Sequence, residues 1–344
     1  GRGSPRPRRT MSNPTPLDGV DVVLADLDGV LYQGPHAIPH AVDALKKAAR
    51  KVRLGFVTNN ASRTPAQVAE QIAGYGLPAL PEAVVTSPQA AIRVLARVVP
   101  AGAKVLVVGG LGLTSEVEKA GFLVVSRADE NPAAVIQGFA PHVGWEHLAQ
   151  ASFALQRDES LPWIATNTDW TIPVAEGIAP GNGALVSAVH LAVGRLATFA
   201  GKPEKEIFDV ARERFQPTLG ALMIGDRLDT DILGANRAGM ASAFVMTGID
   251  SAKSLLASDA SMRPTFVLKD LRELHKPYPE IVRSVDGDAV HTVEVGKAVV
   301  RRKDNVIRVA RPGLPVDLVR AGAAIIHDSG LKIFGLDVDT QIYS

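Results

Sequence analysis

Four groups of polar residues, spread along the chain, could together act on a phosphate ester. They are, in chain order, Asp26 and Asp28, Thr58-Asn59-Asn60, Lys202, and Asp226 with Asp231. A carboxylate that attacks a phosphate ester is repelled by about 4 kcal/mol for one pair of unit charges 4 Å apart at an effective dielectric constant of 20. A magnesium ion that bridges the carboxylate and a phosphate oxygen removes this repulsion. The residue types therefore suit magnesium-assisted chemistry on phosphate.

Taken singly, each group has a commonplace explanation. An Asp-x-Asp pair after a strand often marks a turn, an isolated lysine is usually solvated, and Gly-Asp before a helix often caps that helix. All four groups, in this order within one α/β domain, are hard to attribute to chance. We therefore interpret them as one site.

Two of the carboxylates could hold the cation. Asp26 and Asp226 offer hard oxygen ligands, which suit a Mg²⁺ ion that keeps several of its waters. Lys202 could neutralise the remaining charge of the phosphate. The Thr58 hydroxyl and the backbone amides of Asn59-Asn60 could donate hydrogen bonds to the phosphate oxygens.

Asp28 is suited to moving protons. It lies two residues beyond Asp26, so in an extended chain both side chains point to the same side. From there it could protonate a leaving alkoxide and later deprotonate a water molecule, a role worth roughly 10²–10⁴ in rate. Gly29 would let the backbone turn tightly beside the site.

The elements that must position these residues indicate an α/β fold. Apolar strands are predicted at 20–26, 53–57 and 221–226, directly before three of the four groups. Helices are predicted at 41–51 and, after a capping box, at 65–74. In a parallel sheet, ligands bind beyond the carboxyl ends of the strands. Other predicted elements are strands at 104–110, 122–126, 133–139 and 241–248 and helices at 145–156 and 228–239.

Composition excludes several other classes of function. The 344 residues carry a net charge of +1, and without GRGSPRPRRT at the start, which holds four arginines, the balance is 33 − 36 = −3. A chain with so small a net charge has no overall positive potential that would attract nucleic acid.

The sequence also has no cysteine and no apolar run of 18 residues. We therefore expect no thiolate site, no membrane partner and a cytoplasmic location. Residues 1–17 are expected to be a disordered leader or tag.

The four groups resemble the motifs of the haloacid dehalogenase superfamily of phosphatases. The resembling segments are DLDGVL (26–31), VTNN (57–60), GKP (201–203) and GDRLDTD (225–231). VVGGLGL (107–113), ATNTD (165–169) and GNGAL (181–185) are similar to segments of the cap domain in the branch that contains p-nitrophenyl phosphatases, phosphoglycolate phosphatases and pyridoxal phosphatase.

This resemblance implies specific roles. Asp26 would be the nucleophile that forms an aspartyl-phosphate, and Asp28 the general acid and base. The side chains of Asp26 and Asp226 and the main-chain carbonyl of Asp28 would hold Mg²⁺. Asp231 would lie behind these ligands or orient Lys202. The expected substrate is a small phosphomonoester, with the greatest likeness to enzymes that act on glycerol 3-phosphate; phosphoglycolate and pyridoxal phosphate remain open.

The resemblance also implies the domain organisation. A gap of 144 residues separates Thr58 from Lys202 (202 − 58), enough for an α/β cap, expected at 86–185. The Rossmann-like core would comprise 18–85 and 186–275. Asn167 and Asp169 of the cap are expected to face the substrate. A cap of this kind excludes water from the site and contacts the leaving group of the substrate, which sets substrate specificity.

Residues 276–344 form a third expected unit, of small α+β type. Alternation at 287–310 predicts antiparallel strands, and LKIFGLDV (331–338) a final strand. The unit faintly resembles half of an acetyltransferase, but the loop that would grip coenzyme A is not recognisable. We expect it to serve packing, regulation or dimerisation, with a homodimer through the cap or this unit.

A dinucleotide-binding module is the alternative from another class. Such modules contain, in order, a strand, a glycine loop, a helix, a second strand and an acidic residue. Residues 104–129, KVLVVGGLGLTSEVEKAGFLVVSRAD, nearly match this order. Gly110 and Gly112 fit the pattern and Asp129 stands where a ribose-binding acid would. Ser115 replaces the third glycine, and the segment lies within the expected cap.

Overall fold

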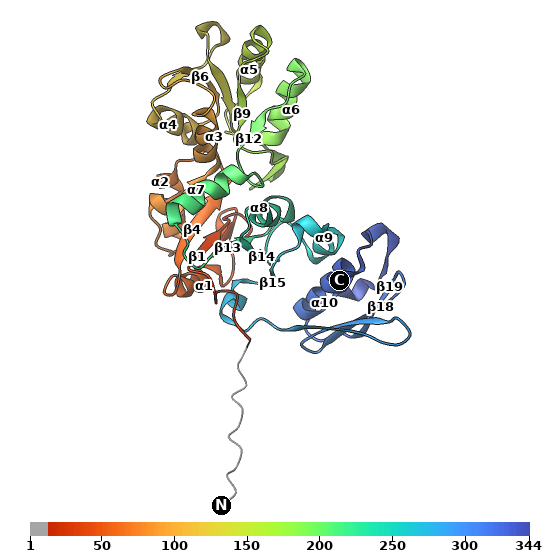
Figure 1. The fold of residues 1–344 in the computed structure, drawn as a ribbon. Coiled ribbons are helices and arrows are strands. Elements are labelled where there is room, and N and C mark those ends of the chain that lie inside the picture. The colour runs from red at the N-terminus through yellow and green to blue at the C-terminus, as the bar shows by residue number, and fades with distance from the viewer. Residues whose placement is uncertain (1–12) are drawn as a thin grey trace, which may run out of the picture.

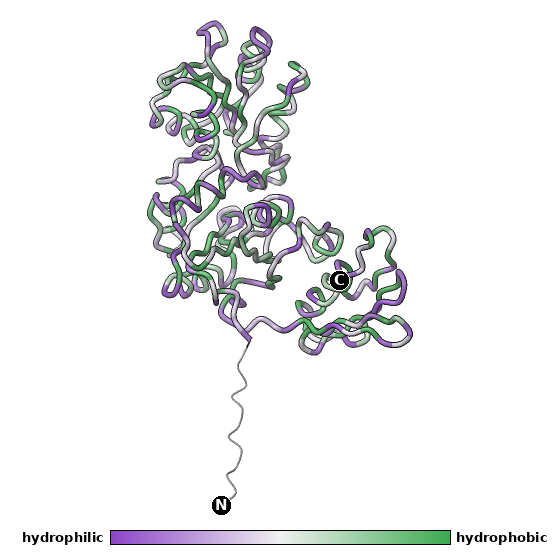
Figure 2. The backbone as a smooth tube through the Cα atoms, in the orientation of Figure 1, coloured by the Kyte–Doolittle hydropathy of each residue, from purple (hydrophilic) through white to green (hydrophobic). Residues whose placement is uncertain are grey.

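The strands of residues 13–344, the part of the chain that the computed structural model describes, form three main sheets (Figure 1). Most of the expected leader, residues 1–12, lies outside the described residues. Residues 13–17 are packed rather than disordered: Leu17 is buried, and the Tyr278 N–H donates to the Pro14 carbonyl at 3.0 Å. Hydrophobic residues lie along the strands, and those of the first sheet pack with apolar residues of the helices (Figure 2). No helix in this part of the chain combines the length and apolar character needed to cross a membrane.

The first sheet is parallel and carries the predicted site at its carboxyl edge. Its order is β15-β14-β13-β1-β4-β5, with the bounds β1 Val22–Ala25, β4 Arg53–Thr58, β5 Val84–Thr86, β13 Ala221–Gly225, β14 Ala241–Val245 and β15 Phe266–Leu268. All four residues of β1 are buried. β1 lies between β4 and β13, with Ala25 level with Phe56 and Ile224. The residues that follow these three strands therefore meet at one edge.

Helices cover both faces of this sheet. α1 (Ala41–Ala48) and α2 (Pro65–Gly74) pack with the side chains of Val23 and Ala25, whereas α3 (Ser87–Leu95) and α7 (Lys205–Phe215) pack with those of Val22 and Leu24. Successive side chains of β1 therefore point to opposite faces of the sheet and pack into two hydrophobic cores. The predicted capping box of α2 is confirmed, with Thr64 accepting from and donating to Gln67.

The helix expected at 228–239 is confirmed over 228–237, but its first turn is not an α-helical one. Leu228–Ile232 form a π-helical turn, and only Leu233–Arg237 form an α-helix, α8. The wide turn lets the Asp231 carboxylate point back to accept the Arg227 N–H at 3.2 Å. Such turns often mark functional sites because they re-aim a side chain.

The second sheet, above the first in Figure 1, is also parallel. Its order is β12-β9-β8-β6-β7, with β6 Lys104–Val108, β7 Leu123–Val125, β8 Ala134–Gln137, β9 Trp163–Ala165 and β12 Thr198–Phe199. Its helices are α4 (Leu111–Lys119), α5 (Trp145–Arg157) and α6 (Asn182–Val193), and a hairpin of β10 (Thr171–Val174) and β11 (Gly177–Pro180) lies between β9 and α6. The boundary expected at 185 falls inside α6, so we propose that the cap ends near residue 199.

The third unit is a sheet packed on one long helix, α10 (Pro315–Ser329). Its antiparallel strands are β16 Ile281–Val285, β17 His291–Val295, β18 Ala298–Lys303 and β19 Val306–Arg311. The final strand expected at 331–338 is wrong over most of its length, because Ile333–Gly335 form a 3₁₀ turn and only β20 (Asp337–Val338) pairs with β19. Gly335 weakens a strand at this point.

A buried arginine joins the third unit to the first. Arg320 of α10 donates through Nε and Nη2 to the Val267 carbonyl of β15, at 2.9 and 2.6 Å. Its charge is met by Asp317 at 2.8 Å and by Glu273 at 3.3 Å. The guanidinium also lies 4.6 Å from the ring centre of Tyr278, whose hydroxyl accepts the Val267 N–H at 2.9 Å.

Replacing this arginine should destabilise the protein. Arg320→Met leaves the carboxylates of Asp317 and Glu273 without their cation, and we expect a loss of about 3 kcal/mol in the free energy of unfolding. Urea unfolding followed by circular dichroism measures it. Arg301→Met, at an exposed position of β18, is the control. Equal stability of the two variants would contradict the role given to Arg320.

Candidate active site

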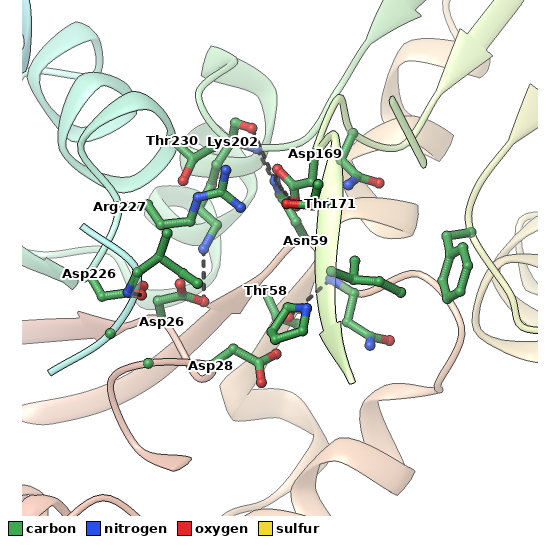
Figure 3. A pocket seen from close by; sticks show the side chains of 18 of the residues that line it. Asp26, Asp28, Thr58, Asn59, Asp169, Thr171, Lys202, Asp226, Arg227 and Thr230 are labelled. Atoms are coloured by element: carbon green, nitrogen blue, oxygen red, sulfur yellow. Dashed lines mark hydrogen bonds and ion pairs between the residues drawn. The ribbon is translucent and has the colours of Figure 1, made fainter. Parts of the chain in front are cut away.

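A cavity of about 340 Å³ lies where the first sheet ends, beneath the β10–β11 hairpin. The predicted site residues that line it are Asp26, Asp28, Thr58, Asn59, Asn60, Asn167, Asp169, Lys202 and Asp226. Figure 3 shows Asp26, Asp226 and Lys202 close together, with Asp28 reaching toward the same space from the turn after β1. The fold thus brings together residues that are up to 200 positions apart (226 − 26).

Lys202 is the centre of this arrangement. Its side chain is 3% exposed, and Nζ donates to Asp26 Oδ1 at 3.0 Å, Asp231 Oδ1 at 2.8 Å and the Val57 carbonyl at 2.9 Å. Burial alone would lower the pKa of Lys202, but the charges of Asp231 and Asp26 outweigh it and raise that pKa. The lysine therefore stays charged.

The carboxylates around Lys202 outnumber it. Oxygens of Asp26, Asp226 and Asp231 lie within 4.8 Å of one another, and all three residues are buried. Burial, together with the charges of Asp26 and Asp231, raises the pKa of Asp226 well above its ordinary value. Burial and the charge of Asp26 raise the pKa of Asp231 to about 7, against the opposing effect of Lys202. One further positive charge would relieve this repulsion.

Asp226 has an oxygen free for such a cation. Its Oδ2 accepts the Ile249 N–H at 2.7 Å, but its buried Oδ1 has no hydrogen-bond partner in the described part of the chain. A buried carboxylate oxygen without a donor is costly unless it binds a cation. Hard oxygen ligands of this kind fit Mg²⁺. We propose Asp26, Asp226 and the Asp28 carbonyl as its ligands.

Two glycines allow the close packing around Asp226. A Cβ atom on Gly29 would lie 2.1 Å from Asp226 Oδ2, and one on Gly248 would lie 2.0 Å from it. Gly29 also has a φ of +77°, a conformation that other residues rarely adopt. The glycine after Asp28 is therefore required on two counts.

Asp231 holds Lys202 rather than offering a ligand. Its Oδ1 accepts from Lys202 Nζ and its Oδ2 accepts the Arg227 N–H. Gly225 leaves room for it, since a Cβ there would lie 2.1 Å from the Asp231 Cβ. With both oxygens engaged, we propose that Asp231 orients the lysine.

Asp28 is an exposed residue that lines the cavity, whereas Asp26, Asp226 and Asp231 are buried. The surrounding protein displaces water and raises the pKa of Asp28, although the charges of Arg63 and Lys202 oppose this effect. A carboxyl with a raised pKa is better able to donate a proton near neutral pH. We propose Asp28 as the proton donor and acceptor.

The side chains of Asn59 and Asn60 shape the loop, which the sequence did not predict. Asn59 Oδ1 accepts the Lys202 N–H at 2.8 Å, and its amide donates to the Lys202 carbonyl at 3.1 Å. Asn60 Oδ1 accepts from the N–H groups of Ser62 and Arg63. The Asn60 N–H, expected to bind phosphate, donates instead to Thr58 Oγ1 at 3.0 Å. The Thr58 hydroxyl hydrogen remains for a phosphate oxygen.

The cap residues Asn167 and Asp169 reach the core. Both Asp169 oxygens accept from the Asn59 amide at 3.4 Å. Burial raises the pKa of Asp169, against the charges of Arg227 and Lys202. Asn167 is buried, and its Oδ1 accepts from the Thr166 hydroxyl at 2.9 Å. Asp169 therefore links the cap to the loop that holds Lys202.

Sequence reasoning missed several residues that line the cavity. Arg227 stands inside the motif segment GDRLDTD, and Arg63 follows VTNN by three residues, so proximity to a motif could have identified them. Tyr32, Phe139 and Ile172 come from elements that carry no motif, and they gave no comparable signal.

The dinucleotide-binding alternative is wrong. The Gly112 N–H at the start of α4, which would face a pyrophosphate, donates to the Ser62 carbonyl at 3.2 Å. A Cβ on Gly112 would lie 2.4 Å from the Arg63 carbonyl oxygen, and one on Gly110 would lie 3.3 Å from that of Ser62. These glycines let the cap approach the core loop, which fills the place of a phosphate.

Sequence comparisons relate the chain to known enzymes. Residues 23–123 match the haloacid dehalogenase-like hydrolases, and residues 199–274 match a HAD-hydrolase-like family. The chain is 42% identical to D-glycerol 3-phosphate phosphatase of Mycobacterium tuberculosis, over 74% of this chain and 71% of that protein. It is 36% identical to glycerol-3-phosphate phosphatase of Gallus gallus, over 72% and 86% of the two chains.

Solved structures show the same relation. The glycerol phosphate phosphatase from Mycobacterium tuberculosis in complex with magnesium superposes with a TM-score of 0.81 at 34% identity, covering 96% of each chain. The 4-nitrophenylphosphatase from Thermotoga maritima gives 0.69 at 29% identity and covers 75% of this chain and 97% of its own. The first match leaves about 4% of this chain outside it, so it includes most of residues 276–344.

Replacing Asp226 by a neutral residue should have opposite effects on two quantities: it should raise the stability of the metal-free protein and abolish the stabilisation by Mg²⁺. In EDTA, Asp226→Asn removes the repulsion among the carboxylates, and we expect the protein to become more stable by on the order of 1 kcal/mol. Mg²⁺ should raise the Tm of the wild type, because it binds only the folded state, and should not raise that of the variant. Asp229→Asn, at an exposed neighbouring position, is the control. An unchanged Mg²⁺-dependent rise in the Asp226 variant would refute the ligand assignment.

Proposed function

Because this chain belongs to the haloacid dehalogenase-like hydrolases and is a phosphoric monoester hydrolase, we propose that it hydrolyses glycerol 3-phosphate with Mg²⁺ through an aspartyl-phosphate. The observation that carries the proposal is the cluster of Asp26, Asp226 and Lys202, in which a buried oxygen of Asp226 has no hydrogen-bond partner among residues 13–344. Mg²⁺ bound there would supply charge neutralisation for the nucleophile and the phosphate oxygens.

In the first half-reaction Asp26 is the nucleophile. Its Oδ1 accepts from the Leu27 N–H at 2.8 Å and from Lys202, which fixes the carboxylate at the end of β1. An oxygen of Asp26 forms a bond to phosphorus while the ester bond breaks. The charge of Lys202, whose three N–H groups are engaged by Asp26, Asp231 and Val57, stabilises the phosphoryl oxygens, and the Thr58 hydroxyl donates to one of them.

Asp28 moves the proton in both half-reactions. As the ester bond breaks, the protonated Asp28 carboxyl gives its proton to the leaving oxygen and releases an alcohol. The resulting carboxylate then takes a proton from water, whose oxygen bonds to phosphorus as the Asp26–phosphorus bond breaks. Phosphate leaves, Asp26 is regenerated, and Asp28 is again protonated.

Glycerol 3-phosphate is the substrate that the comparisons support best. Relatives bearing that name are 36–42% identical over most of their lengths. Phosphoglycolate and pyridoxal phosphate are alternatives, because the cavity of about 340 Å³ could hold each of them.

A substrate panel tests the proposal. Phosphate release would be measured from glycerol 3-phosphate, phosphoglycolate, pyridoxal phosphate and p-nitrophenyl phosphate, each with Mg²⁺ and with EDTA. We expect release only with Mg²⁺, and the highest kcat/KM for glycerol 3-phosphate. A higher kcat/KM for another ester would replace the substrate, and no release from any of them by folded protein would reject the function.

Single substitutions test the assigned roles. Asp26→Asn should abolish turnover with the fold intact, because the amide is nearly isosteric but cannot attack. Asp28→Asn should lower kcat by roughly 10²–10⁴. Lys202→Ala should also lower activity strongly, whereas the exposed Asp229→Ala should change it little. Appreciable turnover by Asp26→Asn would remove it as the nucleophile, and damage by Asp229→Ala equal to that of Asp226→Ala would overturn the metal assignment.

A further inference from the structure

The cavity is lined by three cations, and one of them has only neutral partners. Lys202 is bonded to two carboxylates, and Arg227 lies 3.6 Å from Asp229. Arg63 donates through Nη1 to Gln71 Oε1 and through Nη2 to the Tyr32 hydroxyl at 3.5 Å. Within residues 13–344 it forms no salt bridge with a carboxylate.

The protein holds Arg63 in place from several sides. Asn60 Oδ1 accepts its N–H at 3.2 Å, and Gly112 of the cap packs directly on its carbonyl. Gln71 belongs to α2, and Tyr32 is buried and stacked on Tyr75 at 5.4 Å between ring centres. A cation with its main chain and side chain both fixed is pre-organised for a ligand.

Arg63 lies on the side of the cavity where the leaving group must sit. The phosphoryl group occupies the end formed by Asp26 and Lys202, so the leaving oxygen faces Asp28. Arg63 lowers the pKa of Asp28 more than Lys202 does, although burial, which raises it, is the larger effect. Tyr32, which holds the guanidinium, is joined to Asp28 by a backbone bridge.

We propose that Arg63 selects the leaving group, by donating hydrogen bonds to the hydroxyl oxygens of a polyol phosphate. A guanidinium has five N–H donors, and Gln71 and Tyr32 engage only two of them. Arg227 is less suited to this role, because it already forms an ion pair with Asp229, at 3.6 Å. The proposal rests on the phosphatase function proposed above. It adds that Arg63 recognises the hydroxyl groups of the leaving alcohol.

Two esters that differ only in hydroxyl groups test it. Mg²⁺-dependent kcat/KM would be measured for glycerol 3-phosphate and for propyl phosphate, in the wild type, Arg63→Met and Arg63→Lys. The wild type should favour glycerol 3-phosphate by at least about tenfold, since a site built to bond a hydroxyl rejects the analogue without it. Arg63→Met should lose that preference, with a much larger fall in kcat/KM for glycerol 3-phosphate than for propyl phosphate, and Arg63→Lys should restore part of it. Arg157→Met, at an exposed position of α5, is the control.

The outcomes separate the two proposals. If the wild type cleaves both esters and Arg63→Met loses activity equally on both, Arg63 does not select the leaving group and only this inference fails. If the wild type prefers propyl phosphate or shows no preference, it fails as well. If the wild type releases no phosphate from either ester, the proposed function fails, and this inference with it. Retained activity on propyl phosphate also shows that the variant is folded.

Discussion

Repulsion among three buried carboxylates is the constraint on which the site depends. Asp26, Asp226 and Asp231 share one lysine, so four charges leave a sum of −2 if all are ionised. A divalent cation would bring that sum to zero, which supports the Mg²⁺ site that we propose here. The tight glycines, the buried lysine and the wide turn before α8 all serve to keep these groups within reach of one another.

The positions of the acidic residues could be predicted, but the hydrogen bonds that hold the site could not. Apolar strands stop at Asp26, Thr58 and Asp226, and parallel strands place such residues at one edge. The bond from Asn59 to Lys202 spans 143 residues, and no local pattern announces such a partner. The cap end that we propose near residue 199 has no local signal for a similar reason, because β12 has only two residues and pairs with β9 of the cap.

The glycine loop of the cap, with Gly110 and Gly112, was compatible with two interpretations: a dinucleotide-binding loop and a contact between cap and core. Glycines after a strand permit close approach, but they do not specify what approaches. Here Gly112 approaches the carbonyl oxygens of Ala61 and Arg63, so the glycine loop packs the cap against the loop that follows β4 in the core. Ser115, which replaces the third glycine of the dinucleotide pattern, was the sequence feature that separated the two readings.

The contact between α10 and β15 has a consequence beyond joining two units. β15 is the outer strand of the core sheet, and an outer strand normally presents backbone groups that another chain can pair with. At Val267 both groups are engaged, the N–H by Tyr278 and the carbonyl by Arg320. The C-terminal unit thereby occupies backbone groups through which another chain could otherwise extend the sheet.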